Sequence, residues 1–192
     1  GIVNYTVYSN GNDHLSGIDL SCQSGTACTD FTISFNNNNF GLDAGNTQGI
    51  QTEFFVPYLY DAGTYETTIN ASAEDDGLYT FNIIVPDDDR WSLAPSQLSV
   101  NAGANSQGTV GQIVIGNLGN MELELNLSSS NPSAVQLSEN TVSIPKNSST
   151  SVDVYYTAPS SVGNHTFNIT ASNPGYSIRS NFTEVTINVI NF

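Results

Sequence analysis

Strict alternation of apolar and polar side chains is the feature that most constrains the fold of this chain. Residues 123–127 have the sequence Leu-Glu-Leu-Asn-Leu, and residues 185–189 have Val-Thr-Ile-Asn-Val. Successive side chains of a β-strand point to opposite faces, so this pattern predicts strands with one buried face. Similar segments recur between turns rich in Gly, Pro, Asn and Ser, and no helical periodicity exceeds about one turn. The sequence therefore predicts an all-β protein.

The order of predicted strands occurs twice within the 192 residues. Three pairs of segments align between the halves: residues 7–10 with 114–117, residues 18–21 with 125–128, and residues 63–72 with 163–172. A repeat of roughly one hundred residues matches the size of one immunoglobulin-type sandwich. The sequence Pro-Asp-Asp-Asp-Arg at residues 86–90 separates the copies. We therefore expect two tandem immunoglobulin-like β-sandwich domains, residues 1–88 and residues 89–192.

The two copies differ at their start. The second has a leading segment, residues 91–107, ahead of its strand at Gly108, whereas the sequence begins at Gly1 with the counterpart of that strand. A sandwich without an edge strand exposes unpaired backbone groups and an open groove, which a strand of another molecule can fill. We therefore expect the first domain to lack its leading strand and the protein to form a homopolymer by β-strand complementation. Residues 91–100 of a neighbour or residues 2–9 are the candidate donors; the alternative is that upstream residues were removed or lost.

The charge balance excludes several partners. The formal net charge is −15, because 18 acidic residues face only three cations, Lys146, Arg90 and Arg179. So few cations cannot neutralise a nucleic-acid backbone or bind an anionic membrane surface. No apolar run approaches the roughly 20 residues that span a bilayer, so we expect no direct membrane insertion. Because no apolar leader precedes the first predicted strand, we expect any secretion signal to have been removed.

Two cysteines, Cys22 and Cys28, lie six positions apart around a glycine. A disulfide between them would close a short loop between two strands and would require an oxidising compartment. The alternative is a pair of free thiols, whereas a metal site lacks further His or Cys partners nearby. We favour the disulfide, and with it a secreted or cell-surface location.

Seven Asn-x-Ser/Thr motifs indicate N-linked glycans. About five would arise by chance in so Asn-rich a chain, so their placement is more informative than their number. Most lie opposite apolar residues on predicted strands or within a turn, and should face solvent as glycan acceptors must. The predicted glycosylation sites are Asn4, Asn70, Asn126, Asn147, Asn164, Asn168 and Asn181.

The acidic run Asp87, Asp88 and Asp89 falls between the predicted domains. Carboxylates at such a junction can bind Ca²⁺, so a structural calcium ion is one hypothesis for this segment. The other is a solvated acidic linker, because the chain lacks a regular ligand spacing. We expect no other cofactor.

Catalytic motifs are not apparent in the sequence. His14 and His165 are the two histidines, and neither accompanies a serine-nucleophile motif. The acidic residues fall on turns and outward strand positions rather than in a set that would converge on a substrate. We therefore expect that the protein is not an enzyme.

Three segments resemble the tandem Ig-like repeats of archaeal and bacterial secreted surface proteins of the CARDB or NPCBM-associated type. They are Gly-Asn-Leu-Gly-Asn at residues 116–120, Ile-Pro-Lys-Asn-Ser-Ser-Thr at residues 144–150, and residues 163–171, which end in Phe-Asn-Ile-Thr-Ala. The resemblance covers residues 97–190 well and residues 2–85 more loosely. It implies a β-sandwich fold and a role as a stalk, adhesive module, filament subunit or accessory domain of a secreted hydrolase.

The Asn-, Thr- and Ser-rich, Lys-poor composition also resembles archaeal thread-like surface filaments built by strand exchange. We therefore expect an extracellular structural protein, a subunit of a cell-surface filament or stalk. The alternative is a carbohydrate-binding or spacer module of a secreted hydrolase or adhesin.

Overall fold

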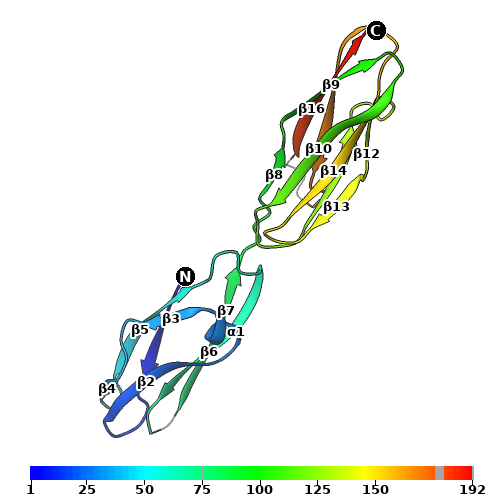
Figure 1. Ribbon diagram of the computed structural model, residues 1–192. Coiled ribbons are helices and arrows are strands. Elements are labelled where there is room, and N and C mark those ends of the chain that lie inside the picture. The colour runs from blue at the N-terminus through cyan, green and yellow to red at the C-terminus, as the bar shows by residue number, and fades with distance from the viewer. Residues whose placement is uncertain (75, 176–179, 192) are drawn as a thin grey trace. The chain divides into compact units, whose positions relative to one another are not determined.

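The computed structural model describes residues 1–74, 76–175 and 180–191, and it divides into two compact units (Figure 1). Unit 1 comprises Gly1–Pro86 and unit 2 comprises Asp87–Phe192. The boundary predicted from the sequence lies slightly later, between residues 88 and 89. Each unit consists of two β-sheets, so the predicted all-β class is confirmed.

Unit 1 pairs a three-stranded sheet with a four-stranded sheet. The first has the order β1-β5-β3, with strands Ile2–Tyr8, Thr47–Phe55 and Thr32–Phe35. The second has the order β4-β2-β6-β7, with strands Phe40–Leu42, Leu15–Ser24, Gly63–Ser72 and Gly77–Val85. All strand pairs of unit 1 that the structure describes are antiparallel.

Unit 2 has one more strand in each sheet. The order β12-β14-β10-β8 contains Val135–Leu137, Ser149–Thr157, Gln107–Asn117 and Trp91–Ala94. The order β13-β11-β15-β16-β9 contains Thr141–Ile144, Leu123–Ser129, Gly163–Ser172, Ser180–Ile190 and Gln97–Gly103. The two additional strands, β8 and β9, come from the leading segment at residues 91–107 that sequence analysis singled out.

The leading segment of unit 2 joins both sheets in turn (Figure 1). β8 pairs antiparallel with β10, the chain crosses at the cis Ala94–Pro95 bond, and β9 then pairs parallel with β16. The sequence had indicated one leading strand, and the structure divides it in two. Each half covers the outer edge of one sheet.

The remaining strands of unit 2 correspond one to one with those of unit 1. The hydrogen bonds between strands show which residues of the two units correspond. The Ser9 N–H donates to the Asn46 carbonyl in unit 1, and in the equivalent place of unit 2 the Asn117 N–H donates to the Ser148 carbonyl. On this register Val7 corresponds to Ile115, and both point inward. The sequence alignment, which put Val7 over Val114, is therefore wrong by one residue on this strand, because alternation alone cannot count the residues that precede a turn.

Alternating strands of unit 2 enclose one continuous hydrophobic core. Leu123, Leu125 and Leu127 on β11 are buried, and the intervening Glu124 and Asn126 are exposed. The same alternation recurs on β16, where Val185, Ile187 and Val189 are fully buried. Trp91 and Leu93 of β8 pack against this core, together with Leu98 and Val100 of β9. The leading segment therefore contributes hydrophobic contacts to the core as well as backbone hydrogen bonds.

A disulfide-bonded turn distinguishes unit 1. Cys22 and Cys28 form the predicted bond, with Cα atoms 5.3 Å apart, and Cys28 lies in the middle of the five-residue helix α1, Thr26–Asp30. Ala27 of this helix and Phe31 after it are buried. The Phe31 ring meets the edges of Tyr60 and Tyr65, at centroid distances of 4.8 and 5.7 Å. The disulfide thus fixes a helix whose apolar face closes one end of the unit.

A hydrogen bond connects the same helix to the aromatic group. The Tyr60 hydroxyl donates to Asp30 Oδ2 at 2.5 Å, and the Thr29 hydroxyl donates to Asp30 Oδ1 at 2.7 Å. The bond to Asp30 raises the pKa of Tyr60 to about 12, and the bonds from Tyr60 and Thr29 lower the pKa of Asp30. Because ionised Asp30 accepts both bonds, its contribution to stability is present above the ordinary carboxyl range and is lost as the pH falls through its lowered pKa.

Replacing both cysteines, C22S together with C28S, should destabilise unit 1 by about 2 kcal/mol, because a short covalent loop is opened in the unfolded state. Circular dichroism during denaturation follows both units, whereas fluorescence of Trp91, the single tryptophan, follows unit 2. The loss of stability should be seen by circular dichroism and not by Trp91 fluorescence. Reductant should destabilise the wild type and leave the double variant unchanged; an equal effect of reductant on both proteins would contradict the prediction.

Tyr60→Phe should raise the pKa of Asp30 toward its ordinary value, because the hydroxyl that stabilises the carboxylate is removed. The carboxyl titration can be followed by NMR. Tyr58→Phe is a matched control, because Tyr58 is an exposed tyrosine of the same loop. An unchanged Asp30 titration in Tyr60→Phe would show that the hydrogen bond is absent in solution.

Candidate strand-acceptor groove

In unit 1, β1 is an outer strand of the first sheet and β7 is an outer strand of the second. Their counterparts in unit 2, β10 and β16, are covered by β8 and β9. In the part of unit 1 that the structure describes, no strand pairs with the outer edge of β1 or of β7. In unit 1, therefore, the two positions that β8 and β9 occupy in unit 2 are both open.

The inward side chains of β7 show what this opening exposes. Tyr79, Phe81 and Ile83 point toward the interior but are not buried, and Tyr79 is 41% exposed. By register their counterparts in unit 2 are Thr183, Val185 and Ile187, which are all fully buried. The same inward face of the same strand is thus sealed in one unit and accessible in the other.

The inward side chains of β1 differ from their counterparts in the same way. Tyr5 and Val7 are half-buried, whereas the corresponding Ile113 and Ile115 of β10 are fully buried. Burial still raises the pKa of Tyr5, whose hydroxyl accepts a hydrogen bond from the Thr52 hydroxyl at 3.0 Å. We refer to the opening between β1 and β7 as the acceptor groove.

A stack of two aromatic rings lies across the acceptor groove. Tyr5 of β1 and Tyr79 of β7 are stacked with ring centroids 5.0 Å apart, and Phe81 lies 5.5 Å beyond Tyr79. These rings are larger than the side chains at the corresponding positions of unit 2. They therefore occupy part of the space that a leading strand would fill, at one stretch of the groove only.

Beside this stack the groove widens into a cavity of about 200 Å³. Its floor is apolar, formed by Leu20, Ile69 and Ala71 of the second sheet. Leu78 at its rim is 62% exposed. A cavity of this size and lining can hold a small hydrophobic group, since an engineered apolar cavity of about 150 Å³ binds benzene.

The sequence predicts an open edge in the first domain, but the prediction included none of these side chains. Tyr5, Tyr79 and Phe81 lie on the inward face of their strands, and alternation predicts the face of a residue but not whether another strand covers that face. A comparison of the two copies could have found them, since each replaces a smaller residue of unit 2.

Six of the seven predicted glycosylation sites have exposed side chains. Asn4 lies on β1, Asn147 in the turn before β14, and the others on three adjacent strands of one sheet of unit 2: Asn126 on β11, Asn164 and Asn168 on β15, and Asn181 on β16. Their exposure is compatible with glycans, whose presence stays a prediction.

Asn70 is the exception, and the expectation that it faces solvent is wrong. Its side chain is only 8% exposed, and its Oδ1 has no hydrogen-bond partner. Asn70 lies on the inner strand β6, between Ser21 of β2 and Leu78 of β7. Alternation correctly places it opposite Ile69, but an outward position on an inner strand can still be covered by longer neighbours.

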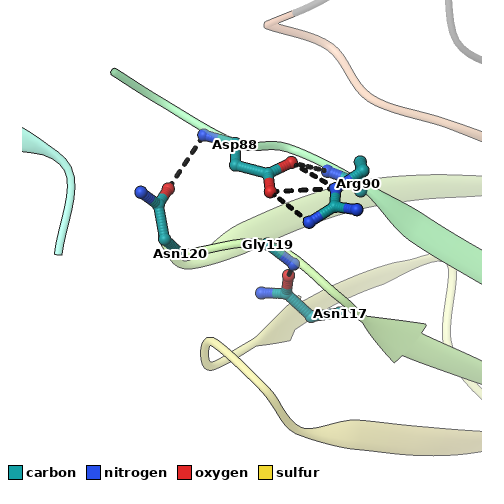
Figure 2. A network of polar contacts seen from close by, with 5 residues as sticks. All are labelled: Asp88, Arg90, Asn117, Gly119 and Asn120. Carbon is teal, nitrogen blue, oxygen red and sulfur yellow. Dashed lines mark hydrogen bonds and ion pairs between the residues drawn. The ribbon is translucent and has the colours of Figure 1, made fainter. Parts of the chain in front are cut away.

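The acidic run at residues 87–89 belongs to unit 2 and lies along its edge (Figure 2). The Asp88 N–H donates to Asn120 Oδ1 at 2.8 Å, and the Asn120 N–H donates to the Asp88 carbonyl at 3.1 Å. The Arg90 guanidinium contacts both carboxylate oxygens of Asp88 at 2.7 to 2.9 Å. A side chain at Gly119 would meet the Asp88 carbonyl oxygen at 1.8 Å, so glycine is required there. This network continues the pairing of β8 with β10.

Bound calcium would have to compete with this network. The Arg90 guanidinium already neutralises the Asp88 carboxylate. Among the described residues, no group of three Asp, Glu, His or Cys side chains is placed to share a metal ion. The calcium hypothesis for Asp87, Asp88 and Asp89 stays a prediction.

The two histidines lie at the surface of different units. His14 Nδ1 is 2.7 Å from the exposed Asp43 carboxylate, and His165 Nε2 is 2.8 Å from the Ser161 carbonyl. Neither contact forms a nucleophile–base–acid arrangement. The expectation that the protein is not an enzyme stays a prediction.

Comparisons with known proteins concern the fold alone. No protein-family model matches the sequence, and no curated protein matches it significantly. The solved structure of protocadherin gamma C5 EC1-3 is 12% identical over 97% of this chain and 61% of its own length, with a TM-score of 0.47. Human CDH23 EC21-23 is 14% identical over 91% of this chain and 63% of its own, with a TM-score of 0.45.

The PapD-like domain 7 of human CEP192 is 10% identical over 53% of this chain and 86% of its own, with a TM-score of 0.43. The chain spans less than two thirds of the length of the protocadherin and CDH23 structures. The fold and the groove together define an immunoglobulin-like β-sandwich protein with two tandem units, one complete and one open.

Asn117→Ala should destabilise unit 2 by about 2 to 3 kcal/mol, because it leaves buried carbonyl groups without a donor. Asn117 is buried, and its Nδ2 donates to the carbonyls of Met121 and Ile144. Trp91 fluorescence during chemical denaturation measures the loss. Leu118→Ala, at the exposed neighbouring position, should change the stability by less than about 0.5 kcal/mol. Equal losses in the two variants would refute the assigned role of the Asn117 amide.

Proposed function

We propose that the protein is a structural subunit of an extracellular surface assembly, in which a neighbouring copy donates an extended segment to the acceptor groove of unit 1. The observation that supports this proposal most strongly is the contrast between the two units. The groove that β8 and β9 fill in unit 2 is open in unit 1, although the strands on either side correspond in order and register.

The physical consequence of an open groove favours complementation. Unpaired backbone donors and acceptors on β1 and β7 can form ladder hydrogen bonds with an added strand. Tyr79, Phe81 and Tyr5 would be removed from water at the same time, and apolar burial contributes about 25 cal/mol per Å². Backbone hydrogen bonds and apolar burial contribute together only when the occupant is an extended chain. A strand therefore fits this groove better than a compact ligand.

An extracellular location agrees with the covalent and surface chemistry. The Cys22–Cys28 disulfide forms in oxidising compartments. None of the described helices is long and apolar enough to cross a membrane. The exposed Asn126 on β11, with Asn164 and Asn168 on the adjacent strand β15, would give that face of the sheet a cover of glycans. These features support a secreted or cell-surface protein.

A carbohydrate-binding or spacer module of a secreted hydrolase or adhesin is the second candidate. Exposed aromatic rings in a groove can stack on sugars. In unit 1, however, Tyr5 and Tyr79 stack on each other, so one face of each ring is already covered. We therefore place the strand-acceptor function first.

Concentration-dependent assembly of the full chain, followed by light scattering and electron microscopy, tests the proposal. The wild type should form polymers that withstand mild denaturant. Tyr79→Lys should prevent assembly, because it places a charge in the acceptor groove where a donated strand would bury it.

Tyr155→Lys is the matched control. Tyr155 is 39% exposed, close to the value for Tyr79, but lies on β14, which has a neighbouring strand on each side. This variant should assemble like the wild type. Wild-type chains that remain monomers at every concentration, or equal loss in both variants, would refute assembly through the groove.

A further inference from the structure

The turn between β1 and β2 contains Asn10–Gly11, and Asn10 is the only asparagine of the sequence that is followed by a glycine. The side-chain carbonyl carbon of an asparagine can be attacked by the backbone nitrogen of the next residue, because the two atoms close a five-membered ring. Glycine favours this attack, since it has no Cβ to shield its nitrogen and its backbone adopts a wide range of conformations. Asn10 therefore has the neighbour that most favours attack on its own side chain.

The fold leaves both reacting groups of this turn unrestrained. The Asn10 side chain is exposed. Within the described residues, neither the Asn10 amide nor the Gly11 N–H forms a hydrogen bond. The β1 side of the turn is held as far as Ser9, whose N–H donates to the Asn46 carbonyl at 3.1 Å, and β2 begins at Leu15. The backbone between them can therefore rotate until the Gly11 nitrogen meets Asn10 Cγ, and no hydrogen bond of Gly11 has to break.

Two other asparagines that precede a small residue are placed differently. Asn105 is also exposed in a turn, but the Ser106 N–H after it donates to the Gly103 carbonyl at 3.1 Å. Asn70 and the following Ala71 lie on the inner strand β6, where Asn70 is only 8% exposed. A backbone nitrogen that is bonded or held in a sheet must first be released before it can attack. The structure thus distinguishes Asn10 from both.

We propose that Asn10–Gly11 is a site of spontaneous deamidation, which converts Asn10 to aspartate and isoaspartate. The Gly11 nitrogen forms a bond to Asn10 Cγ, the bond from Cγ to Nδ2 breaks, and the Gly11 proton leaves with Nδ2 as ammonia. Water, the one co-reactant, then opens the cyclic imide. Cleavage of the bond between the Gly11 nitrogen and Cγ gives aspartate, and cleavage of its bond to the Asn10 backbone carbonyl carbon gives isoaspartate. Neither step oxidises or reduces any group.

The modification places a new carboxylate at one end of the acceptor groove. Asn10 and Asp76 line the same hollow of about 250 Å³, which shares Tyr8 and Ala71 with the cavity described above. Residues 1–86 contain ten acidic side chains and no Lys or Arg, so no such cation of unit 1 offsets the added charge. Deamidation therefore makes the formal net charge of −15 more negative by one, next to a carboxylate that is already present.

The inference is independent of the proposed function, because the reaction occurs within one turn of a single chain. Incubation of the purified full chain at neutral and at mildly alkaline pH, followed by mass spectrometry, tests it. The protein should gain the mass that corresponds to exchange of NH for O, and fragmentation should place this change at Asn10. The converted fraction should rise with time, and faster at higher pH, because the attacking nitrogen must lose its proton. Asn105 should stay unconverted over the same period.

Gly11→Ala is the matched variant for the attacking residue. A Cβ at Gly11 would meet nothing within 4 Å, and φ of Gly11 lies outside the left-handed region, so the substitution should leave the fold intact. It should slow the conversion about tenfold, because the added methyl group shields the nitrogen. Gly49→Ala, which also introduces a Cβ into open space, should react at the wild-type rate.

Asn10→Gln provides a second variant, at the residue that is modified. Its longer side chain would have to close a larger ring, so the mass change at this position should disappear. Three results would each overturn the proposal: Asn10 that stays unmodified in the wild type at alkaline pH, equal rates in the wild type and Gly11→Ala, or conversion of Asn105 as fast as that of Asn10. Isoaspartate and aspartate at position 10, separated by chromatography of the peptides, would support the cyclic imide as the intermediate.

Discussion

The leading segment of unit 2 is the contact on which the contrast between the units depends. By pairing first with β10 and then with β16, it covers the outer edges of both sheets with one continuous stretch of chain. Its inward side chains complete a core in which Val185, Ile187 and Val189 are fully buried. Backbone pairing and apolar burial are thus supplied together, so the loss of this segment removes both.

Unit 1 compensates for the open edges in two ways. The Tyr5–Tyr79 stack bridges β1 and β7, and large aromatic side chains replace the smaller side chains of unit 2 along the groove. At the other side of the unit, the disulfide and helix α1 hold Phe31 against Tyr60 and Tyr65. Aromatic contacts and a covalent link therefore stabilise a sandwich whose aliphatic core is less completely enclosed than that of unit 2.

Alternation and repetition in the sequence predicted most of the strands and their faces, and the difference between the copies pointed to the open edges of β1 and β7. Short elements were missed: Phe40–Leu42 follows an asparagine run, and Thr26–Asp30 is too short to show helical periodicity. The burial of Asn70 and the off-by-one alignment of Val7 share a cause, because both depend on neighbouring strands that a local pattern does not contain. The groove itself lies between strands far apart in sequence, so the sequence could indicate its existence but not its cavity or its aromatic stack.

The direction of the leading segment has a consequence for any assembly built on the groove. The edges of β1 and β7 admit an added chain in one orientation when it follows the path of β8 and β9. A donor and an acceptor are different surfaces, so the contact is heterologous and forms an open row when each copy donates to the next copy and not back to its own donor. The resulting polymer would be polar, with a vacant acceptor at one end and an unused donor at the other. Its growth could then be stopped at a single end by any chain that offers a donor and no acceptor.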